Sequence, residues 1–172
     1  MTATDIPPPS HVWPDLAGRL IIDSGGPHHV LPVRVYFEDT DAGGVVYHAA
    51  YVRFAERGRT DFLRLLGTDA RRMIDGSDGS EPAAFVVRRM TFDFARPARM
   101  DDLLEVETRV KELGGASVAL SQAIVRQGQR LCEADVTVVL VSMAGKPLRL
   151  SDQVREAFAR TSSTATPIEL PR

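Results

Sequence analysis

Residues 35–62 read VYFEDTDAGGVVYHAAYVRFAERGRTDF, which indicates a strand, an acidic glycine turn and a helix in direct succession. Ahead of the turn, one side of an alternating pattern is apolar, as in a half-buried strand: Leu31, Val33, Val35 and Phe37. After the turn, three- and four-residue steps separate Tyr51, Phe54, Ala55, Gly58, Phe62 and Leu66, while Arg53, Glu56, Arg57, Arg59 and Arg64 fill the other side. This spacing predicts a long amphipathic helix that begins near Val45 or Val46.

The turn combines groups that are suited to attack on an acyl carbonyl. Gly43 and Gly44 lack a Cβ, so the backbone here can adopt left-handed angles and lie close to a ligand. The first amides of the predicted helix carry the positive end of its dipole, which favours a charged Asp41 and can also hold an oxyanion. His48 falls in the first helical turn, where it can orient a substrate or a water.

Two other interpretations of the turn exist. Asp41 can be a simple N-terminal helix cap, which leaves the glycine pair and His48 without a role. Asp39, Asp41 and Gly44 also coincide with positions one, three and six of an EF-hand calcium loop. Positions five and twelve would then be Gly43 and Ala50, which lack the required oxygens. Because no Cys and His cluster with zinc spacing is present either, we predict no metal site.

The run from Tyr36 to His48, followed by Tyr51, Phe54 and Glu56-Arg57, resembles the Tol-Pal-associated acyl-CoA thioesterases. These are hot-dog-fold proteins of the branch that includes 4-hydroxybenzoyl-CoA thioesterase. The similarity continues through residues 84–90, 95–99 and 101–103 and, more weakly, to about Val154. It implies hydrolysis of an acyl-CoA thioester to free acid and coenzyme A. No cofactor is expected, because coenzyme A is part of the substrate.

The resemblance also implies roles for single residues. The family's acidic catalytic residue falls on Asp41, and its motif histidine falls on His48, whose backbone amide would polarise the thioester carbonyl. Asp41 would act as a general base on water or as a nucleophile, and the sequence leaves both options open. Four further residues are expected to line the oxyanion and substrate pocket: Gly44, Val45, Tyr47 and Tyr51.

One position of the helix departs from the family. Gly58 stands where relatives usually carry alanine. Glycine weakens a helix by about 0.5–1 kcal/mol relative to alanine, unless close packing requires it. This substitution does not touch the expected chemistry.

Composition and length indicate one globular domain, since the chain has 172 residues and is 44% hydrophobic. A net charge of −2 gives no electrostatic basis for nucleic-acid binding. No apolar run approaches the roughly 20 residues that cross a bilayer, and Met1–Asp5 lacks the positive charge of a secretory signal, so we predict a cytoplasmic protein. Cys132 is the only cysteine and alternates with apolar strand residues, which favours buried packing over nucleophilic catalysis.

We divide the chain into three parts. Residues 1–30 are rich in Pro and Gly and are predicted to be a flexible extension, although Leu20-Ile21-Ile22 can add a short strand. Within this extension, His28 and His29 are expected in a solvated loop rather than at a metal. Residues 31–160 form the predicted hot-dog domain, and residues 161–172 form a loose tail.

Beyond the helix, residues 75–82 have the composition of a polar loop. Four strands follow near 84–94, 103–113, 117–127 and 130–142, with turns at Gly114-Gly115 and Gly128-Gln129, and Ser151 or Asp152 caps a closing helix. One long helix and about five strands indicate an α+β domain whose antiparallel sheet packs one face on that helix. This agrees with the hot-dog fold. The resemblance further implies a homodimer or homotetramer, with sheets joined edge to edge and active sites at the interface.

Coenzyme A carries phosphates, which call for basic side chains near the site entrance. Arg88, Arg89, Arg96 and Arg99 are the candidates, of which the first three are preferred. Because adjacent strand residues face opposite ways, Arg88 and Arg89 are not expected to share one groove.

Two other functions remain compatible with the sequence. Hot-dog hydratases and dehydratases also act on acyl thioesters, with a histidine paired to an acid on the helix, and Glu56 is an acid on the predicted helix. Alternatively, the protein is a non-catalytic acyl-CoA-binding or scaffold component near envelope or phospholipid-synthesis proteins, as the family name suggests.

Overall fold

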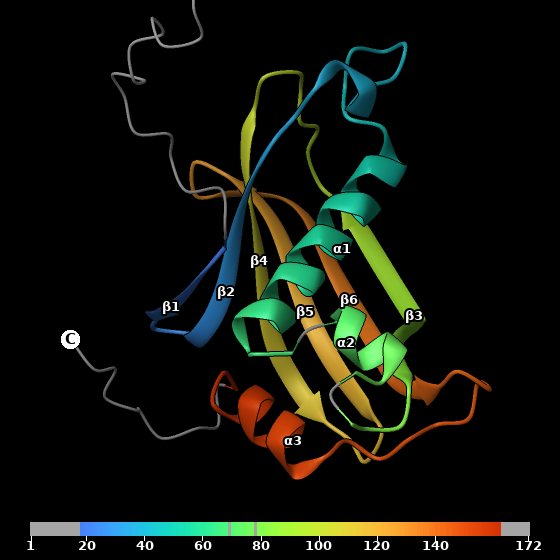
Figure 1. Cartoon of the computed structure of the whole chain (residues 1–172). Coiled ribbons are helices and arrows are strands. Elements are labelled where there is room, and N and C mark those ends of the chain that lie inside the picture. The colour runs from blue at the N-terminus through green and yellow to red at the C-terminus, as the bar shows by residue number, and fades with distance from the viewer. Residues whose placement is uncertain (1–17, 69, 78, 163–172) are drawn as a thin grey trace, which may run out of the picture.

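Figure 1 shows a computed structural model of the chain, which describes residues 18–68, 70–77 and 79–162. The strands are β1 (Arg19–Asp23), β2 (Gly26–Arg34), β3 (Ala83–Phe94), β4 (Leu103–Leu113), β5 (Ser117–Arg126) and β6 (Gln129–Ser142). The helices are the 3-10 turn η1 (Phe37–Asp39), α1 (His48–Leu65), α2 (Ala70–Asp75) and α3 (Asp152–Ala159). Among the described residues, no helix has both the length and the apolar character needed to span a membrane.

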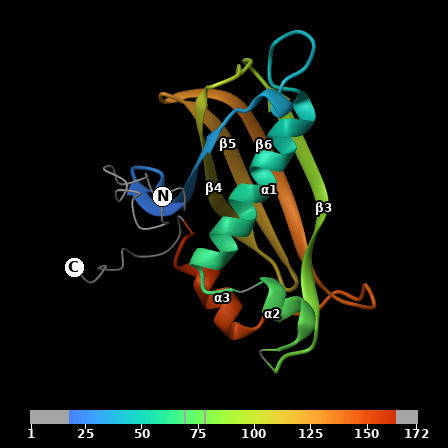
Figure 2. The same cartoon turned by 45° about the horizontal axis from the view of Figure 1, so that its top comes forward.

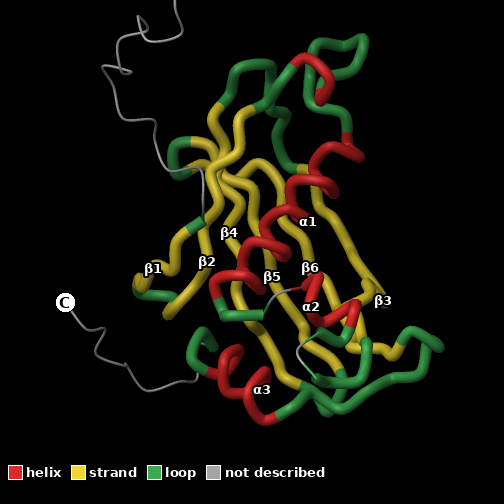
Figure 3. Tube along the Cα trace, in the orientation of Figure 1, coloured by secondary structure: helices red, strands yellow, loops and turns green. Residues whose placement is uncertain are grey.

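The strands form one antiparallel sheet in the order β1-β2-β4-β5-β6-β3, which curves around α1 (Figures 1 and 2). Helices α2 and α3 lie at the end of the molecule where β3 begins, and the loop before α1 lies at the opposite end (Figure 3). The apolar face of α1 packs on the inner faces of β2, β4, β5 and β6, and Phe158 of α3 also belongs to the core. The predicted hot-dog architecture is confirmed, with six strands instead of about five.

The strands after α1 agree with the prediction to within one residue at each end. The predicted turn at Gly128-Gln129 is formed one residue earlier, where Gln127 and Gly128 both have positive φ, at 51° and 76°. Ser151 caps the closing helix, because its side-chain oxygen accepts a hydrogen bond from the Val154 amide. Helix α2 is an addition, since the sequence predicted only a polar loop from residue 75 onward.

Part of the predicted N-terminal extension belongs to the sheet. β1 contains Leu20-Ile21-Ile22, as considered above, and the boundary at residue 30 falls inside β2. Arg109 fixes this hairpin through Nη2, which donates to Asp23 Oδ2 at 2.7 Å, and through Nη1, which donates to the Gly26 carbonyl at 3.1 Å. Residues 1–17 of the extension and residues 163–172 of the tail lie outside the described residues.

The segment between β2 and α1 differs from its predicted form. Val35 is buried as expected, but Phe37 is 81% exposed, so its predicted place on the apolar side is wrong. The cause is η1, which interrupts the strand alternation after Tyr36. Helix α1 begins at His48, later than Val45 or Val46, because Thr40 pairs with Val46 and closes a tight loop over residues 41–45.

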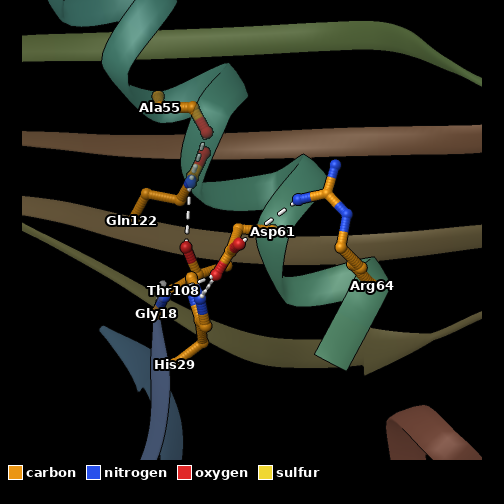
Figure 4. Close-up of polar contacts among 7 residues, drawn as sticks. All are labelled: Gly18, His29, Ala55, Asp61, Arg64, Thr108 and Gln122. Carbon is orange, nitrogen blue, oxygen red and sulfur yellow. Dashed lines mark hydrogen bonds and ion pairs between the residues drawn. The ribbon is translucent and has the colours of Figure 1, made fainter. Parts of the chain in front are cut away.

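A buried polar network joins α1 to the sheet beneath it (Figure 4). Gln122 Nε2 donates to the Ala55 carbonyl oxygen and to Thr108 Oγ1, each at 3.0 Å. Arg59 Nη1 donates to Gln122 Oε1 at 2.7 Å. Arg59 is therefore only 5% exposed, and its predicted place on the solvated side of the helix is wrong. Its side chain folds under the helix to reach a polar partner, which the charge pattern alone did not indicate.

A second polar cluster joins the N-terminal hairpin to α1 (Figure 4). His29 Nε2 donates to Asp61 Oδ2 at 2.9 Å, and the Gly18 amide donates to the same oxygen at 2.9 Å. His28 and His29 are both buried, so the predicted solvated loop is wrong. The physical reason is that β2 begins at Gly26 and turns His29 toward α1, where its ring packs near Phe62.

We predict that Gly58→Ala destabilises the protein, because a Cβ at this position would lie 2.8 Å from Val106 Cγ1. Helix propensity alone predicts a gain of about 0.5–1 kcal/mol, whereas overpacking of a filled core costs about 1–3 kcal/mol. Urea denaturation measures the net effect. The double variant Gly58→Ala/Val106→Ala is the control, and it should lose less than the sum of the two single losses. A Gly58→Ala protein as stable as the parent contradicts this account.

We also predict that His29 titrates at a lower pH in the folded chain than in the unfolded chain. Burial lowers the pKa of His29, and its hydrogen bond to Asp61 only partly opposes this effect. Below about pH 6.5 the unfolded state therefore binds more protons at His29 than the folded state does. The contribution of His29 consequently lowers the free energy of unfolding as the pH falls. NMR titration of the His29 imidazole provides the test. Its signal is assigned by comparison with the His29→Gln variant, in which that signal is absent. A higher pKa in the native protein than in urea rules the explanation out.

Candidate active site

The loop before α1 is held by Asp39, a residue to which the sequence analysis gave no functional role. Its carboxylate is 2% exposed, and Oδ2 accepts a hydrogen bond from the Tyr36 amide at 3.0 Å. Oδ1 lies 3.4 Å from Arg53 Nη2, and the Asp39 carbonyl accepts from the Tyr47 amide at 2.8 Å. Asp39 follows Tyr36 by three residues, which is the spacing of a capping box. This spacing is the sequence signal from which the structural role of Asp39 can be predicted.

Asp41 lies two residues further along, with its side chain exposed at the same end of α1. Its Oδ1 accepts a hydrogen bond from the Gly43 amide at 2.8 Å, which orients the carboxylate toward its own loop. The loop is closed by the Asp41 amide, which donates to the Val45 carbonyl at 2.9 Å. Gly44 has a φ of 72°, so the predicted left-handed backbone is confirmed there. The exposed carboxylate is thus both oriented and accessible to water.

The helix-cap interpretation of Asp41 is wrong. The N-cap of α1 is Tyr47, in extended conformation, and no side chain bonds to the first turn as a cap. The Ala50 amide donates to the Tyr47 carbonyl at 2.8 Å, whereas no described residue accepts a hydrogen bond from the His48 amide. This amide therefore has the free donor that an oxyanion requires.

The two aromatic candidates have different environments. Tyr47 is exposed, and its ring packs against the His48 imidazole with centroids 4.2 Å apart. Tyr51 is buried, and its hydroxyl oxygen accepts a hydrogen bond from the Ala98 amide at 2.9 Å. Burial raises the pKa of the Tyr51 hydroxyl, although the bond from Ala98 opposes the shift. Tyr51 thus supports the segment after β3 through this hydrogen bond.

Arg88, Arg89 and Arg96, the preferred candidates for phosphate binding, lie on or just after β3, an edge strand of the sheet. The register of β3 against β6 shifts between Val87 and Arg89, so Arg88 is the extra residue of a β-bulge. We expected Arg88 and Arg89 to face opposite sides of the sheet, because strand residues normally alternate. The bulge interrupts this alternation of side-chain direction at Arg88. Arg96 follows β3, where its Nη1 donates to the Arg130 carbonyl at 3.3 Å. All three side chains are exposed.

Cys132 takes no part in this site. It is buried, and burial raises the pKa of its thiol to about 12. The thiol is therefore protonated at neutral pH, and the predicted packing role is confirmed.

Comparison with known proteins assigns these features to one family. The thioesterase superfamily pattern matches residues 43–133 of the chain. Acyl-CoA thioesterase YbgC of Haemophilus influenzae is 43% identical over 128 residues, which are 74% of this chain and 91% of that protein. Acyl-CoA thioester hydrolase YbgC of Escherichia coli O6:H1 is 45% identical over 129 residues, 74% of this chain and 92% of that one. A probable thioesterase structure from Bartonella henselae superposes with a TM-score of 0.69 at 44% identity, covering 72% of this chain and 99% of that one.

Proposed function

Because the chain belongs to the thioesterase superfamily, we propose that it hydrolyses acyl-CoA thioesters to free acid and coenzyme A. The names of its relatives support this substrate class. The observation that carries the proposal is the presence of an exposed, oriented carboxylate, Asp41, at the helix end that presents the His48 amide.

In the proposed reaction, the thioester carbonyl lies against the His48 amide, which stabilises the negative charge that develops on oxygen. Asp41 removes a proton from water as the water attacks the carbonyl carbon, or attacks the carbon itself to form an anhydride that water then opens. In either case the carbon–sulfur bond breaks and the coenzyme A thiolate leaves. The His48 imidazole, which packs on Tyr47, orients the substrate. No further cofactor is required.

The proposed catalytic unit is a homodimer joined at β3. This 12-residue strand is an edge of the sheet, since β6 pairs with one side of it and no described strand pairs with the other. Val86, Val87 and Met90 on β3 are all more than one third exposed. An exposed, apolar edge of this length favours pairing with an identical strand. Arg88, Arg89 and Arg96 would then lie at the interface, where they bind the coenzyme A phosphates.

The alternatives find less support. Glu56, which a hydratase would use, is bonded to Arg59 and Thr60 of its own helix. Association with envelope or phospholipid-synthesis proteins and a cytoplasmic location remain predictions.

We predict that Asp41→Asn lowers kcat for acyl-CoA hydrolysis by about 10²–10⁴-fold, the usual contribution of a general base. The amide keeps the shape of the carboxylate and removes its charge. A chromogenic thiol assay follows coenzyme A release, and the buried Cys132 should not react with the reagent in the native protein. Asp135→Asn, on the exposed outer surface, is the matched control and should keep the parent rate. Parental activity in Asp41→Asn disproves the assigned role.

We further predict that Met90→Lys converts the dimer to a folded monomer that is largely inactive. The substitution places two like charges at the proposed β3–β3 contact, while an exposed position tolerates lysine in the monomer. Light scattering gives the mass, and circular dichroism confirms folding. Met143→Lys, at an exposed methionine outside β3, should remain dimeric and active. A monomeric parent protein, or a dimeric and active Met90→Lys protein, contradicts the proposed assembly.

A further inference from the structure

The sheet has a second edge, which is the strand β1 (Figure 1). β2 pairs with one side of this five-residue strand, and no described strand pairs with the other side. Its three apolar side chains are exposed, with values of 42% for Leu20, 43% for Ile21 and 59% for Ile22. The only charges, Arg19 and Asp23, lie at the two ends of the strand. β1 thus lacks the central charges, prolines and bulges that usually protect an edge strand from pairing.

Two prolines of β2 show which backbone groups of β1 are open. Proline has no N–H, so within a sheet it occupies positions where a ladder hydrogen bond is not needed. Pro32 lies opposite Glu105 of β4 and beyond the residues that pair with β1, whereas Pro27 lies opposite Ile22 and beyond the residues that pair with β4. Both positions are satisfied when Pro27 directs its backbone away from β1. Ile22 and, two residues earlier, Leu20 therefore direct their N–H and C=O groups toward the open edge.

The sequence of β1 is complementary to itself in the antiparallel direction. When two copies pair about a two-fold axis through Ile21, Arg19 of one copy lies opposite Asp23 of the other. Leu20 then lies opposite Ile22, so the open backbone groups of the two copies meet and form hydrogen bonds. A shift of one residue would instead place these open groups against groups that are already bonded to β2. Charge, apolar contact and backbone bonding therefore favour the same register.

The end charges of β1 are available for such a contact. Arg19 is exposed and has no ion-pair partner among the described residues. Asp23 accepts hydrogen bonds from Arg109 Nη2 and from the Gly25 amide, yet its side chain remains 46% exposed. A carboxylate has about four acceptor positions, so Asp23 can also bind Arg19 of a second copy. Two such ion pairs would form, because the two-fold axis repeats each interaction.

The strand is held in an extended form before any partner binds. Arg109 fixes its C-terminal end through Asp23. At the other end, the Gly18 amide donates to Asp61 of α1, and a Cβ at Gly18 would overlap His29 Nε2. Glycine therefore permits the close approach that leads directly into β1. Because the edge is already ordered, pairing with a second copy does not incur the entropy cost of ordering a loop.

We propose that β1 pairs in the antiparallel direction with β1 of a second copy of the chain, with Ile21 on the two-fold axis. This contact is separate from the proposed β3 contact, because the two strands are opposite edges of the sheet, and it does not depend on the proposed hydrolysis. A five-residue strand is only about 16 Å long, too short to bury the roughly 1,600 Å² of a stable complex. The β1 contact therefore forms in concentrated solution and dissociates on dilution.

Disulfide cross-linking tests the register. Ile21→Cys places two thiols in a non-hydrogen-bonded pair, whose Cα atoms are about 4.5 Å apart and can be bridged. Cys132 is buried and does not compete. In concentrated solution with oxidised glutathione, Ile21→Cys should form a covalent dimer about tenfold faster than Met143→Cys, an exposed control in the turn after β6. Leu20→Cys should react no faster than this control, because the two copies of residue 20 lie more than about 7 Å apart in the proposed register.

Sedimentation equilibrium measures the association without a cross-link. The average mass of the parent protein should rise above its value in dilute solution as the concentration increases. Ile21→Lys places two like charges at the axis and should abolish this rise. Arg19→Asp replaces two ion pairs by two repulsions and should weaken the association about tenfold. Met143→Lys is the matched control and should associate as the parent does, while circular dichroism confirms that every variant is folded.

Three results would overturn the proposal. The first is a mass that stays constant with concentration, and the second is cross-linking of Ile21→Cys no faster than that of Met143→Cys. The third is cross-linking of Leu20→Cys faster than that of Ile21→Cys, which rejects the register. If the mass is constant but Ile21→Lys changes the fluorescence of Trp13, the only tryptophan, residues 1–17 of the same chain cover the edge in place of a second copy.

Discussion

The close contact between α1 and the sheet at Gly58 positions both ends of the helix. The absence of a Cβ lets the helix backbone approach Val106, and the Gln122 amide beneath it bonds to Ala55, Thr108 and Arg59. Every polar atom of this buried amide is therefore paired, which gives the contact a directional bond pattern in addition to apolar packing. Sliding or rotation of the helix on the sheet would break these hydrogen bonds in the buried interior. Its N-terminal amides and its C-terminal half consequently keep fixed positions.

Asp39 and Asp41, two acids in the loop before α1, have different roles because their environments differ. Asp39 is buried, accepts a backbone hydrogen bond and lies near Arg53, so it stabilises the entry into α1. Asp41 is exposed, and the hydrogen bond that its carboxylate accepts from the Gly43 amide orients it. A carboxylate whose bonds are already committed to the fold is poorly suited to exchange protons with a substrate. The loop thus favours Asp41 for chemistry because Asp39 performs the structural task.

The features that the sequence predicted well are those with a local signature. Strands β4, β5 and β6 have period-two patterns bounded by turn residues, and Gly43 and Gly44 mark the turn before α1. Two of the failures depend on distant partners, and the third is local. Arg59 is buried because Gln122 lies beneath it, and His29 is buried because Asp61 meets it from α1. Phe37 is exposed because η1 ends the alternation early. No periodicity in the sequence encodes contacts between residues more than thirty positions apart.

The pocket between α1, α2 and β3 is the strongest case of this kind, because α1, α2, β3, β5, β6 and α3 all contribute to its walls. The Asp41 loop is fixed by hydrogen bonds at one end of α1, whereas Met73, which lines this pocket, belongs to a six-residue helix at the other end. A substitution in α2 can therefore change the shape of the pocket without moving the Asp41 carboxylate or the His48 amide.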